Sequence, residues 1–141
     1  QKKYYEYLTC TIKNLAIKNF FFLNTRQDIR SLLKAIDIYV CTSKNESSPL
    51  SVWEAMSMEK AIVSTDVGDV KKFVNDGVNG LIVKVGNTNK LAKSIKKLIE
   101  KPKLRKKFGK KSRQIAKKKL NIKMCGKLYS VAYRIFSKSY L

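Results

Sequence analysis

The sequence predicts an α/β protein in which a parallel sheet is covered by helices on both faces. Short apolar runs, of the length typical of buried strands, alternate with longer segments whose apolar residues recur at helical spacing. Strands separated by helices form parallel sheets, because each crossover returns the chain to the same end of the sheet. The loops that follow the strands then gather at one edge, where proteins of this class bind ligands.

Apolar spacing and turn residues also predict the order of the elements. Helices are expected at 4–17, 28–35, 49–58, 69–74 and 87–100, and helical pattern continues from 102 to 137. Buried strands are expected at 19–23, 38–41, 61–64 and 81–83. Asn79-Gly80 is a typical turn dipeptide and should lead into the last of these strands. Asn87 or Thr88 should cap the helix that follows it.

Composition is that of one soluble globular domain. A chain of 141 residues can bury a core of ordinary size. No apolar run approaches the roughly 20 residues that span a bilayer, and the first residues lack the apolar segment of a signal peptide. Cys10, Cys41 and Cys125 are widely spaced, which favours reduced thiols in a cytosol. Histidine is absent and the acids are scattered, so no metal and no cofactor are expected.

Two carboxylates, Glu46 and Glu54, flank the expected start of a helix at Pro49 and are separated by seven residues. This spacing alone favours an ordinary interpretation, in which one is a loop acid and the other a surface residue of the helix. Acid pairs at this spacing are common by chance, but a pair that flanks a helix start directly after an apolar strand, here at 38–41, is less common. This position places both residues at the ligand-binding edge of the predicted sheet.

The helix start itself is suited to an anion. Proline fits the first helical position because its missing N–H would be unpaired there, and Ser48 is then the expected N-cap. Helix N-termini carry unpaired amides and a partial positive charge, so they bind phosphate. The amides of Leu50 and Ser51 would meet the anion, while acidic side chains nearby would accept hydrogen bonds from hydroxyl groups. A nucleotide sugar has both kinds of group.

Several motifs in order resemble the donor-site signature of GT-B glycosyltransferases, specifically glycosyltransferase family 4 (group 1). They lie in the run DIYVCTSKNESSPLSVWEAMSMEKAIVSTDVG at 37–68 and in DGVNGLIV at 76–83. The similarity extends from about residue 20 to about residue 108. The chain departs from the family pattern at Ser47 and Glu59, where glycine is usual, and the turn at Glu59 is expected to need a positive φ.

The resemblance implies a Rossmann-like domain that binds a nucleotide sugar, and it assigns roles to individual residues. Glu46 would be the catalytic residue, contacting the transferred sugar and stabilising its developing positive charge, and Glu54 would bind the ribose. The donor sugar and phosphates would be bound at Ser47, Ser48, Pro49, Leu50 and Ser51. Arg26 and Ser43 would lie near the nucleotide. Alternatively, Arg26 pairs with Asp28 and Ser43 simply ends its strand.

The resemblance covers only the later part of the C-terminal, donor-binding domain of these two-domain enzymes. We therefore expect a partial Rossmann-like domain at 1–108 and a basic helical extension packing on it at 109–141. The implied activity is retaining transfer of a sugar from a nucleotide-sugar donor to a glycan or lipid-linked acceptor. A missing N-terminal domain would bind that acceptor, and the isolated chain is expected to be inactive.

Basic residues are concentrated towards the C-terminus. The stretch 101–141 contains no Asp or Glu, whereas it holds almost half of the 31 lysines and arginines. Contact with an anionic membrane, contact with nucleic acid or a solvated lysine-rich face would each account for this. Nucleic acid is the least favoured partner, because Tyr129, Tyr133 and Phe136 have the spacing of a helical core stripe. We expect a cytoplasmic protein, with peripheral contact to the inner face of the membrane left open.

A non-catalytic function is the alternative to glycosyl transfer. A truncated gene could encode a nucleotide-binding module, or a basic module that interacts with membranes or nucleic acid. Titration of UDP, GDP and ADP sugars against the chain would distinguish a nucleotide-binding module from a basic module. A steep salt dependence would instead indicate binding through the basic stretch.

Overall fold

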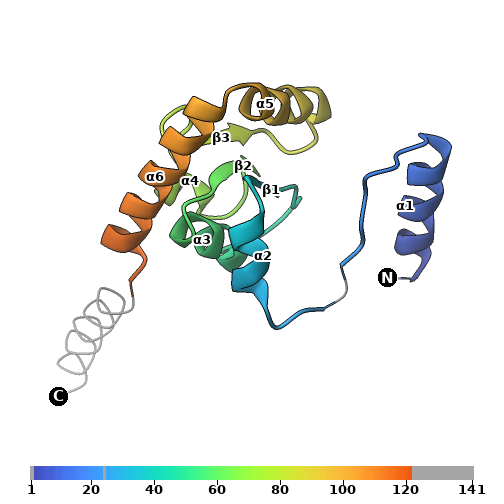
Figure 1. Ribbon diagram of the computed structural model, residues 1–141, viewed down its shortest axis with the longest axis horizontal. Coiled ribbons are helices and arrows are strands. Elements are labelled where there is room, and N and C mark those ends of the chain that lie inside the picture. Colours follow the sequence, from blue (N-terminus) through green and yellow to red (C-terminus); the bar gives the residue numbers. More distant parts are fainter. Residues whose placement is uncertain (1, 24, 122–141) are drawn as a thin grey trace, which may run out of the picture.

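The computed structural model describes residues 2–23 and 25–121 (Figure 1). Its helices are α1 (Lys2–Asn14), α2 (Ile29–Ala35), α3 (Leu50–Ser57), α4 (Val70–Phe73), α5 (Thr88–Glu100) and α6 (Pro102–Lys119). Its strands are β1 (Ile38–Cys41), β2 (Ala61–Thr65) and β3 (Gly80–Val83). Cys125 and the aromatic stripe predicted at Tyr129, Tyr133 and Phe136 lie outside the described residues.

The three strands are parallel and follow one another across the sheet in the order β1, β2, β3. Ile38 pairs with Ala61 between the first two strands, and Ile62 pairs with Gly80 between the last two. Every residue of β2 and β3 is buried, as expected where helices cover both faces of a parallel sheet. The predicted α/β class and the three strands from residue 38 onwards are confirmed.

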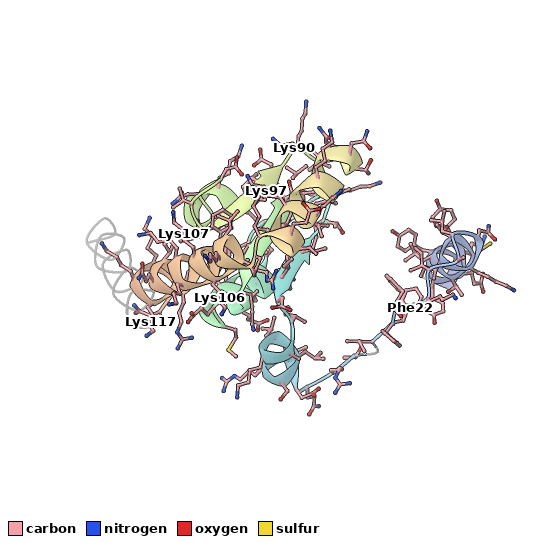
Figure 2. All side chains as sticks on the ribbon, turned by 45° about the horizontal axis from the view of Figure 1, so that its top comes forward. Phe22, Lys90, Lys97, Lys106, Lys107 and Lys117 are labelled. Carbon is pink, nitrogen blue, oxygen red and sulfur yellow. The ribbon has the colours of Figure 1, made fainter. Side chains whose placement is uncertain are left out.

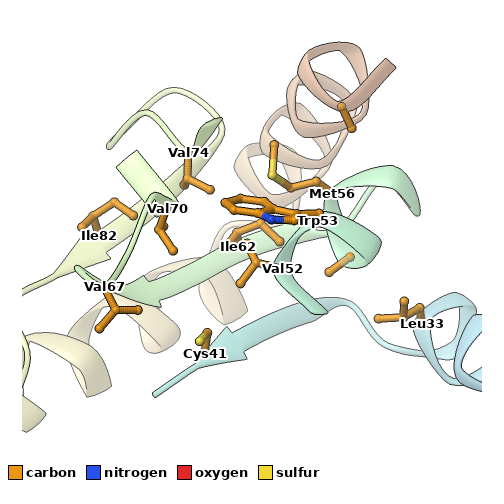
Figure 3. Packing of buried hydrophobic residues seen from close by; sticks show 12 residues of the cluster. Leu33, Cys41, Val52, Trp53, Met56, Ile62, Val67, Val70, Val74 and Ile82 are labelled. Carbon is orange, nitrogen blue, oxygen red and sulfur yellow. The ribbon is translucent and has the colours of Figure 1, made fainter. Parts of the chain in front are cut away.

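Alternate residues of the strands point to opposite faces and form two hydrophobic cores. One core lies between the sheet and helices α2, α3 and α4, and it includes Ile62 and Ile82 (Figure 3). Here the ring of Trp53 packs edge-on against Phe73, with ring centroids 4.8 Å apart. The other core lies against α5 and α6 and contains Ala61, Val63, Leu81, Leu98 and Phe108. Strand β2 supplies both cores and therefore has no exposed side.

Helix α6 crosses the amino-terminal ends of the strands. Arg105 forms an ion pair with Asp37, which precedes β1, with the nitrogen and oxygen 3.5 Å apart. Ser112 Oγ donates to the carbonyl of Asn79, which precedes β3, at 2.8 Å. The middle of the helix packs on the turn that precedes β2. Because α6 is continuous through residues 108 and 109, the boundary expected there falls inside one helix.

The strand predicted at 19–23 is wrong. These residues lie outside the described sheet, and Phe21 and Leu23 are 79% and 60% exposed. Phe22 instead packs on Tyr5 of α1, with ring centroids 4.6 Å apart. Together with α1, the segment stands apart from the sheet (Figure 1). An apolar run becomes a strand only where a neighbouring strand accepts its hydrogen bonds, and no strand in the described part of the chain pairs with this one.

Helix ends differ from the predicted ones where the backbone turns. The helix expected at 4–17 ends at Asn14, because Ala16 adopts a left-handed φ of 50° that a helix cannot continue. Helix α6 ends at Lys119, and the helical pattern predicted beyond residue 121 lies outside the described residues. The cap of α5 is confirmed at Asn87, whose side chain accepts from the amide of Lys90 at 2.9 Å.

Gly109→Ala should destabilise the fold, although alanine is the better helix former. A β-carbon at position 109 would collide with the carbonyl oxygen of Glu59. Such overpacking costs about 1–3 kcal/mol, whereas the gain in helix propensity is at most about 1 kcal/mol. Thermal and urea unfolding followed by circular dichroism would measure the loss. Gln114→Ala, at an exposed position of the same helix, is the matched control. An unchanged or higher midpoint for Gly109→Ala would contradict the packing.

Glu59→Gly should stabilise the fold. Glu59 has a φ of 62°, which confirms the positive φ expected there, and it follows Met58, the C-cap of α3. Glycine is common at this position because a side chain in the left-handed conformation costs roughly 1–2 kcal/mol. Urea unfolding should therefore show a gain of about 1 kcal/mol for Glu59→Gly and none for Glu59→Ala. Equal midpoints for the two variants would show that the turn stores no strain.

Candidate functional site

Two loops meet at the carboxyl-terminal edge of the sheet. The loop after β1 carries Glu46, and the turn after β2 contains Asp69. The amide of Asp69 donates to the carbonyl of Ser47 at 3.0 Å. On the other side of Glu46, the carbonyl of Ser43 accepts from Thr65 Oγ1 at 2.7 Å. The segment that carries Glu46 is therefore held on both sides by β2 and the turn after it.

Gly68 allows these two loops to approach each other closely. It has a φ of 50°, and a β-carbon there would collide with the carbonyl oxygen of Ser47 and lie 2.7 Å from that of Glu46. Only glycine combines this conformation with the absence of a side chain. Earlier in the same turn, Asp66 forms an ion pair with Lys71. The turn is thus fixed in place beside the loop after β1.

Glu46 is exposed, and its carboxylate is oriented by hydrogen bonds from its own loop. The hydroxyl of Ser43 donates to Oε1 of Glu46 at 2.9 Å. The thiol of Cys41 donates in turn to the Ser43 hydroxyl, with sulfur and oxygen 3.7 Å apart. Ser43 follows the end of its strand and orients Glu46. Sequence reasoning missed this second role, because the contact depends on the path of the loop between the two residues.

The predicted N-cap of α3 is wrong. The helix begins at Leu50 with Pro49 as N-cap, and no side chain caps it. The hydroxyl of Ser48 instead accepts a hydrogen bond from Trp53 Nε1 at 3.1 Å, because a buried indole N–H needs an acceptor. Leu50 and Ser51 are exposed, and their amides belong to the first turn, whose donors have no partner within a helix. The start of α3 therefore presents amides that no side chain caps, and its binding of an anion stays a prediction.

Tyr39 of β1 lies beside the start of α3, where it forms a hydrogen bond with Ser51. Burial raises the pKa of its phenol, and a hydrogen bond with Ser51 opposes that rise. Repulsion from the carboxylates of Glu54 and Glu46 raises the pKa of Tyr39 further. The hydrogen bond between Tyr39 and Ser51 joins β1 to the first turn of α3. Sequence reasoning missed Tyr39, although strand alternation places it on the same face of the sheet as Cys41.

Glu54 borders a groove of about 360 Å³ between α2 and α3. The apolar side chains that line this groove are those of Ile29, Leu33, Leu50, Trp53, Met58 and, at the end of α6, Leu120. Its basic residue is Arg30, which no sequence motif indicated. Arg26, expected near the nucleotide, forms two hydrogen bonds of 2.7 Å to the carboxylate of Asp28. This pairing raises the pKa of Arg26 and lowers the pKa of Asp28.

Two kinds of feature are absent from the part of the chain that the structure describes. In residues 2–23 and 25–121, no three His, Cys, Asp or Glu side chains are grouped so that they could hold a metal ion. None of the helices described there combines the length and the apolar character needed to cross a bilayer. Cys10 is exposed, Cys41 is buried, and both are free thiols.

Comparison with known proteins identifies relatives of this chain. The family model described as glycosyl transferases group 1 matches residues 1–115. EpsD of Bacillus subtilis, described as a putative glycosyltransferase, is 31% identical over 110 residues, which cover 78% of this chain and 29% of that protein. The N,N'-diacetylbacillosaminyl-diphospho-undecaprenol alpha-1,3-N-acetylgalactosaminyltransferase of Campylobacter jejuni is 37% identical over 95 residues, which cover 67% of this chain and 25% of that protein.

Solved structures agree with the sequence relatives. Anabaena Alr3699/HepE in complex with UDP-glucose matches with a TM-score of 0.82 and 28% identity, covering 92% of this chain and 38% of that one. The C-terminal domain of LpcC, a glycosyl transferase group 1 family protein from Francisella tularensis, matches with a TM-score of 0.77 and 26% identity. The match covers 85% of this chain and 64% of that domain's chain. The chain thus spans well under half the length of most of these relatives. With a family match over most of its length and a relative of 31% identity, this chain belongs to the glycosyl transferases group 1 family.

Proposed function

We propose that this chain provides the donor-binding part of a retaining glycosyltransferase, of the type grouped as glycosyltransferase family 4. The donor would be a nucleoside diphosphate sugar. The observation that carries the proposal is that Glu46 in the loop before α3 and Glu54 within α3 flank the start of a helix that no side chain caps. Membership of the glycosyl transferases group 1 family and likeness to a structure solved with UDP-glucose support it.

The diphosphate of the donor would lie at the N-terminus of α3. The amides of Leu50 and Ser51 and the partial positive charge of the helix start suit this group. The hydroxyl of Ser47 is exposed, and that of Ser48 can still donate its proton after accepting from Trp53. Negative charge grows on the leaving phosphate as the bond to the sugar breaks. Donors already in position stabilise that charge without reorganising.

Glu46 would contact the transferred sugar. Its carboxylate belongs to the loop before the helix, and one of its oxygens is held by Ser43. Positive charge develops on the sugar ring as the leaving phosphate departs. A carboxylate fixed beside the ring stabilises this charge through electrostatic attraction.

The nucleoside would extend along α3 in the other direction. Glu54 stands about one helical turn beyond Leu50, so its carboxylate can accept hydrogen bonds from ribose hydroxyls. The apolar groove between α2 and α3 starts beside Glu54 and would cover one side of the nucleoside, with Arg30 in its lining. Arg26, in the loop before α2, would move closer to the base only by leaving Asp28.

The complete reaction is proposed for a longer protein, since the chain spans 29% and 25% of the two sequence relatives. We propose a glycan or lipid-linked acceptor bound by a separate domain. The name of the Campylobacter jejuni relative, which contains diphospho-undecaprenol, supports the lipid-linked case. Such a reaction would take place in the cytoplasm at the inner face of the membrane. The isolated chain would bind the donor without turnover.

Glu46 and Glu54 should affect different steps. In the longer protein, Glu46→Gln should lower kcat by about 10²–10³-fold, because it removes charge that stabilises the transition state. Glu54→Ala should mainly raise the donor KM, by roughly tenfold or more, because it removes a charge-assisted hydrogen bond to the ribose. Steady-state kinetics with a saturating acceptor would separate the two effects.

Calorimetric titration of UDP-glucose into the isolated chain provides the complementary measurement. Glu54→Ala should weaken binding, whereas Glu100→Ala, which removes an exposed carboxylate of α5, should leave it unchanged. Near-native turnover of Glu46→Gln would overturn the catalytic assignment. Binding that does not depend on Glu54 would overturn its role towards the ribose.

Gly68→Ala should impair donor binding through the loop that carries Glu46. The added β-carbon would push against the carbonyls of Glu46 and Ser47. Gly77→Ala is the matched control, because Gly77 also has a positive φ but would have nothing within 4 Å of its β-carbon. Both variants should lose about 1–2 kcal/mol of stability from backbone strain, and Gly68→Ala should lose more. Only Gly68→Ala should weaken UDP-glucose binding in titration; equal binding by the two variants would contradict this coupling.

A further inference from the structure

Helix α6 presents a face that consists almost entirely of lysine. Its buried positions, including Phe108, Ser112 and Ala116, pack towards the sheet and α3. Between residues 103 and 119, every exposed position of the helix is a lysine except Gln114. The lysine face is formed by Lys103, Lys106, Lys107, Lys110, Lys111, Lys117, Lys118 and Lys119. At about 1.5 Å per residue, it extends for roughly 25 Å.

Part of the lysine face surrounds a shallow groove of about 640 Å³. Five of its lysines line the groove, together with Gly77 and Val78 from the turn before β3. Lysines of α5, among them Lys90 and Lys97, continue the basic surface beside Asp76. Figure 2 shows the labelled lysines of both helices extending from the body of the protein into solvent.

The lysine face lacks carboxylate partners. The ion pairs found among the described residues involve Arg26, Lys71, Lys96 and Arg105 and no lysine of the face. Glu59 borders Lys110 but lies beyond ion-pair distance. Lysines gathered without counter-charges repel one another, and this repulsion is relieved when an anionic surface approaches.

The lysine face and the candidate donor site lie at opposite ends of the strands. Helix α6 crosses the amino-terminal ends, where it contacts Asp37 and Asn79. The donor site follows the carboxyl-terminal ends, at Glu46 and the start of α3. A partner on the part of the lysine face at 103–111 would therefore leave Glu46 and the start of α3 open, and the two would bind independently.

We propose that the lysine face docks on a membrane surface that contains acidic phospholipids. Lipid phosphates move laterally and can match a row of flexible lysines, and each basic residue near such a surface contributes about 1 kcal/mol. Lysine also contacts nucleic-acid phosphates, but sequence-specific recognition adds arginine or amide contacts to bases, and binding of single strands adds aromatic stacking. The face offers one amide, Gln114, and no aromatic side chain. The chemistry of the face therefore fits lipid phosphates better.

Co-sedimentation of the full chain with vesicles tests the proposal. The chain should bind vesicles of phosphatidylcholine and phosphatidylglycerol in equal proportion, should not bind phosphatidylcholine alone, and should dissociate as salt is raised. Replacing Lys103, Lys107, Lys110 and Lys111 together by glutamine should weaken binding by roughly several hundredfold, since about 1 kcal/mol per lysine is about fivefold each. The same positions replaced by arginine should retain binding.

The matched control removes the same charge elsewhere. Lys13, Lys18, Lys34 and Lys72 are exposed and lie outside α5 and α6, so replacing these four by glutamine should change binding far less. If the α6 variant with four replacements has a lowered melting temperature, two double variants replace it in the test: Lys103 with Lys107, and Lys110 with Lys111, each pair changed to glutamine. Each double variant should bind the acidic vesicles about tenfold or more weakly.

Four outcomes would overturn the proposal. Equal losses in the α6 and control variants would show a net-charge effect without a defined face. Equal binding to both kinds of vesicle would exclude recognition of acidic lipid. Tighter binding to duplex DNA than to the acidic vesicles at the same salt would indicate a nucleic-acid surface. Displacement of the chain from vesicles by UDP-glucose would show that the lysine face and the donor site are not independent. Failure to bind UDP-glucose, with vesicle binding intact, would contradict only the proposed donor site.

Discussion

The hydrogen bond from the Asp69 amide to the Ser47 carbonyl, together with the close approach that Gly68 permits, is the constraint on which the candidate site depends. It ties the loop after β1 to the turn after β2, so Glu46 is carried by two neighbouring strands. A loop held in this way presents its carboxylate with little loss of conformational entropy when a ligand binds. The backbone, and only secondarily the side chains, positions the catalytic candidate.

The buried strand β2 separates two chemically distinct ends of the molecule. Its carboxyl end and the turn after it hold the loop after β1, which carries Glu46 and leads to the start of α3. Its amino end is covered by α6, which packs through Phe108 and Gly109 and presents lysine outward. We propose phosphate groups as ligands of both ends, but in different forms. The donor end offers oriented amides suited to one diphosphate, whereas the lysine end offers mobile charges suited to an extended anionic surface.

Features that arise from residues adjacent in sequence could be predicted well. Asn87 caps α5, Asn79-Gly80 leads into β3, and Glu59 adopts its expected positive φ, because each depends on local backbone chemistry. The segment 19–23 was predicted wrongly, because the same apolar composition serves a strand or a packed loop. Ser48 failed as a cap for a related reason: its hydroxyl had a second candidate partner, Trp53, which only burial brings into competition.

The sequence by itself determined the fold class, the order of the elements and the presence of two acids around a helix start, since apolar period and turn chemistry are encoded locally. Only the tertiary structure decided that Ser43 orients Glu46, that Tyr39 lies near both carboxylates, and that Arg26 is engaged by Asp28. It also decided that the lysines of α6 lie at the end of the sheet opposite the donor site. These relations depend on how loops and helices meet across the sheet, and the pattern along a single chain does not specify such distances.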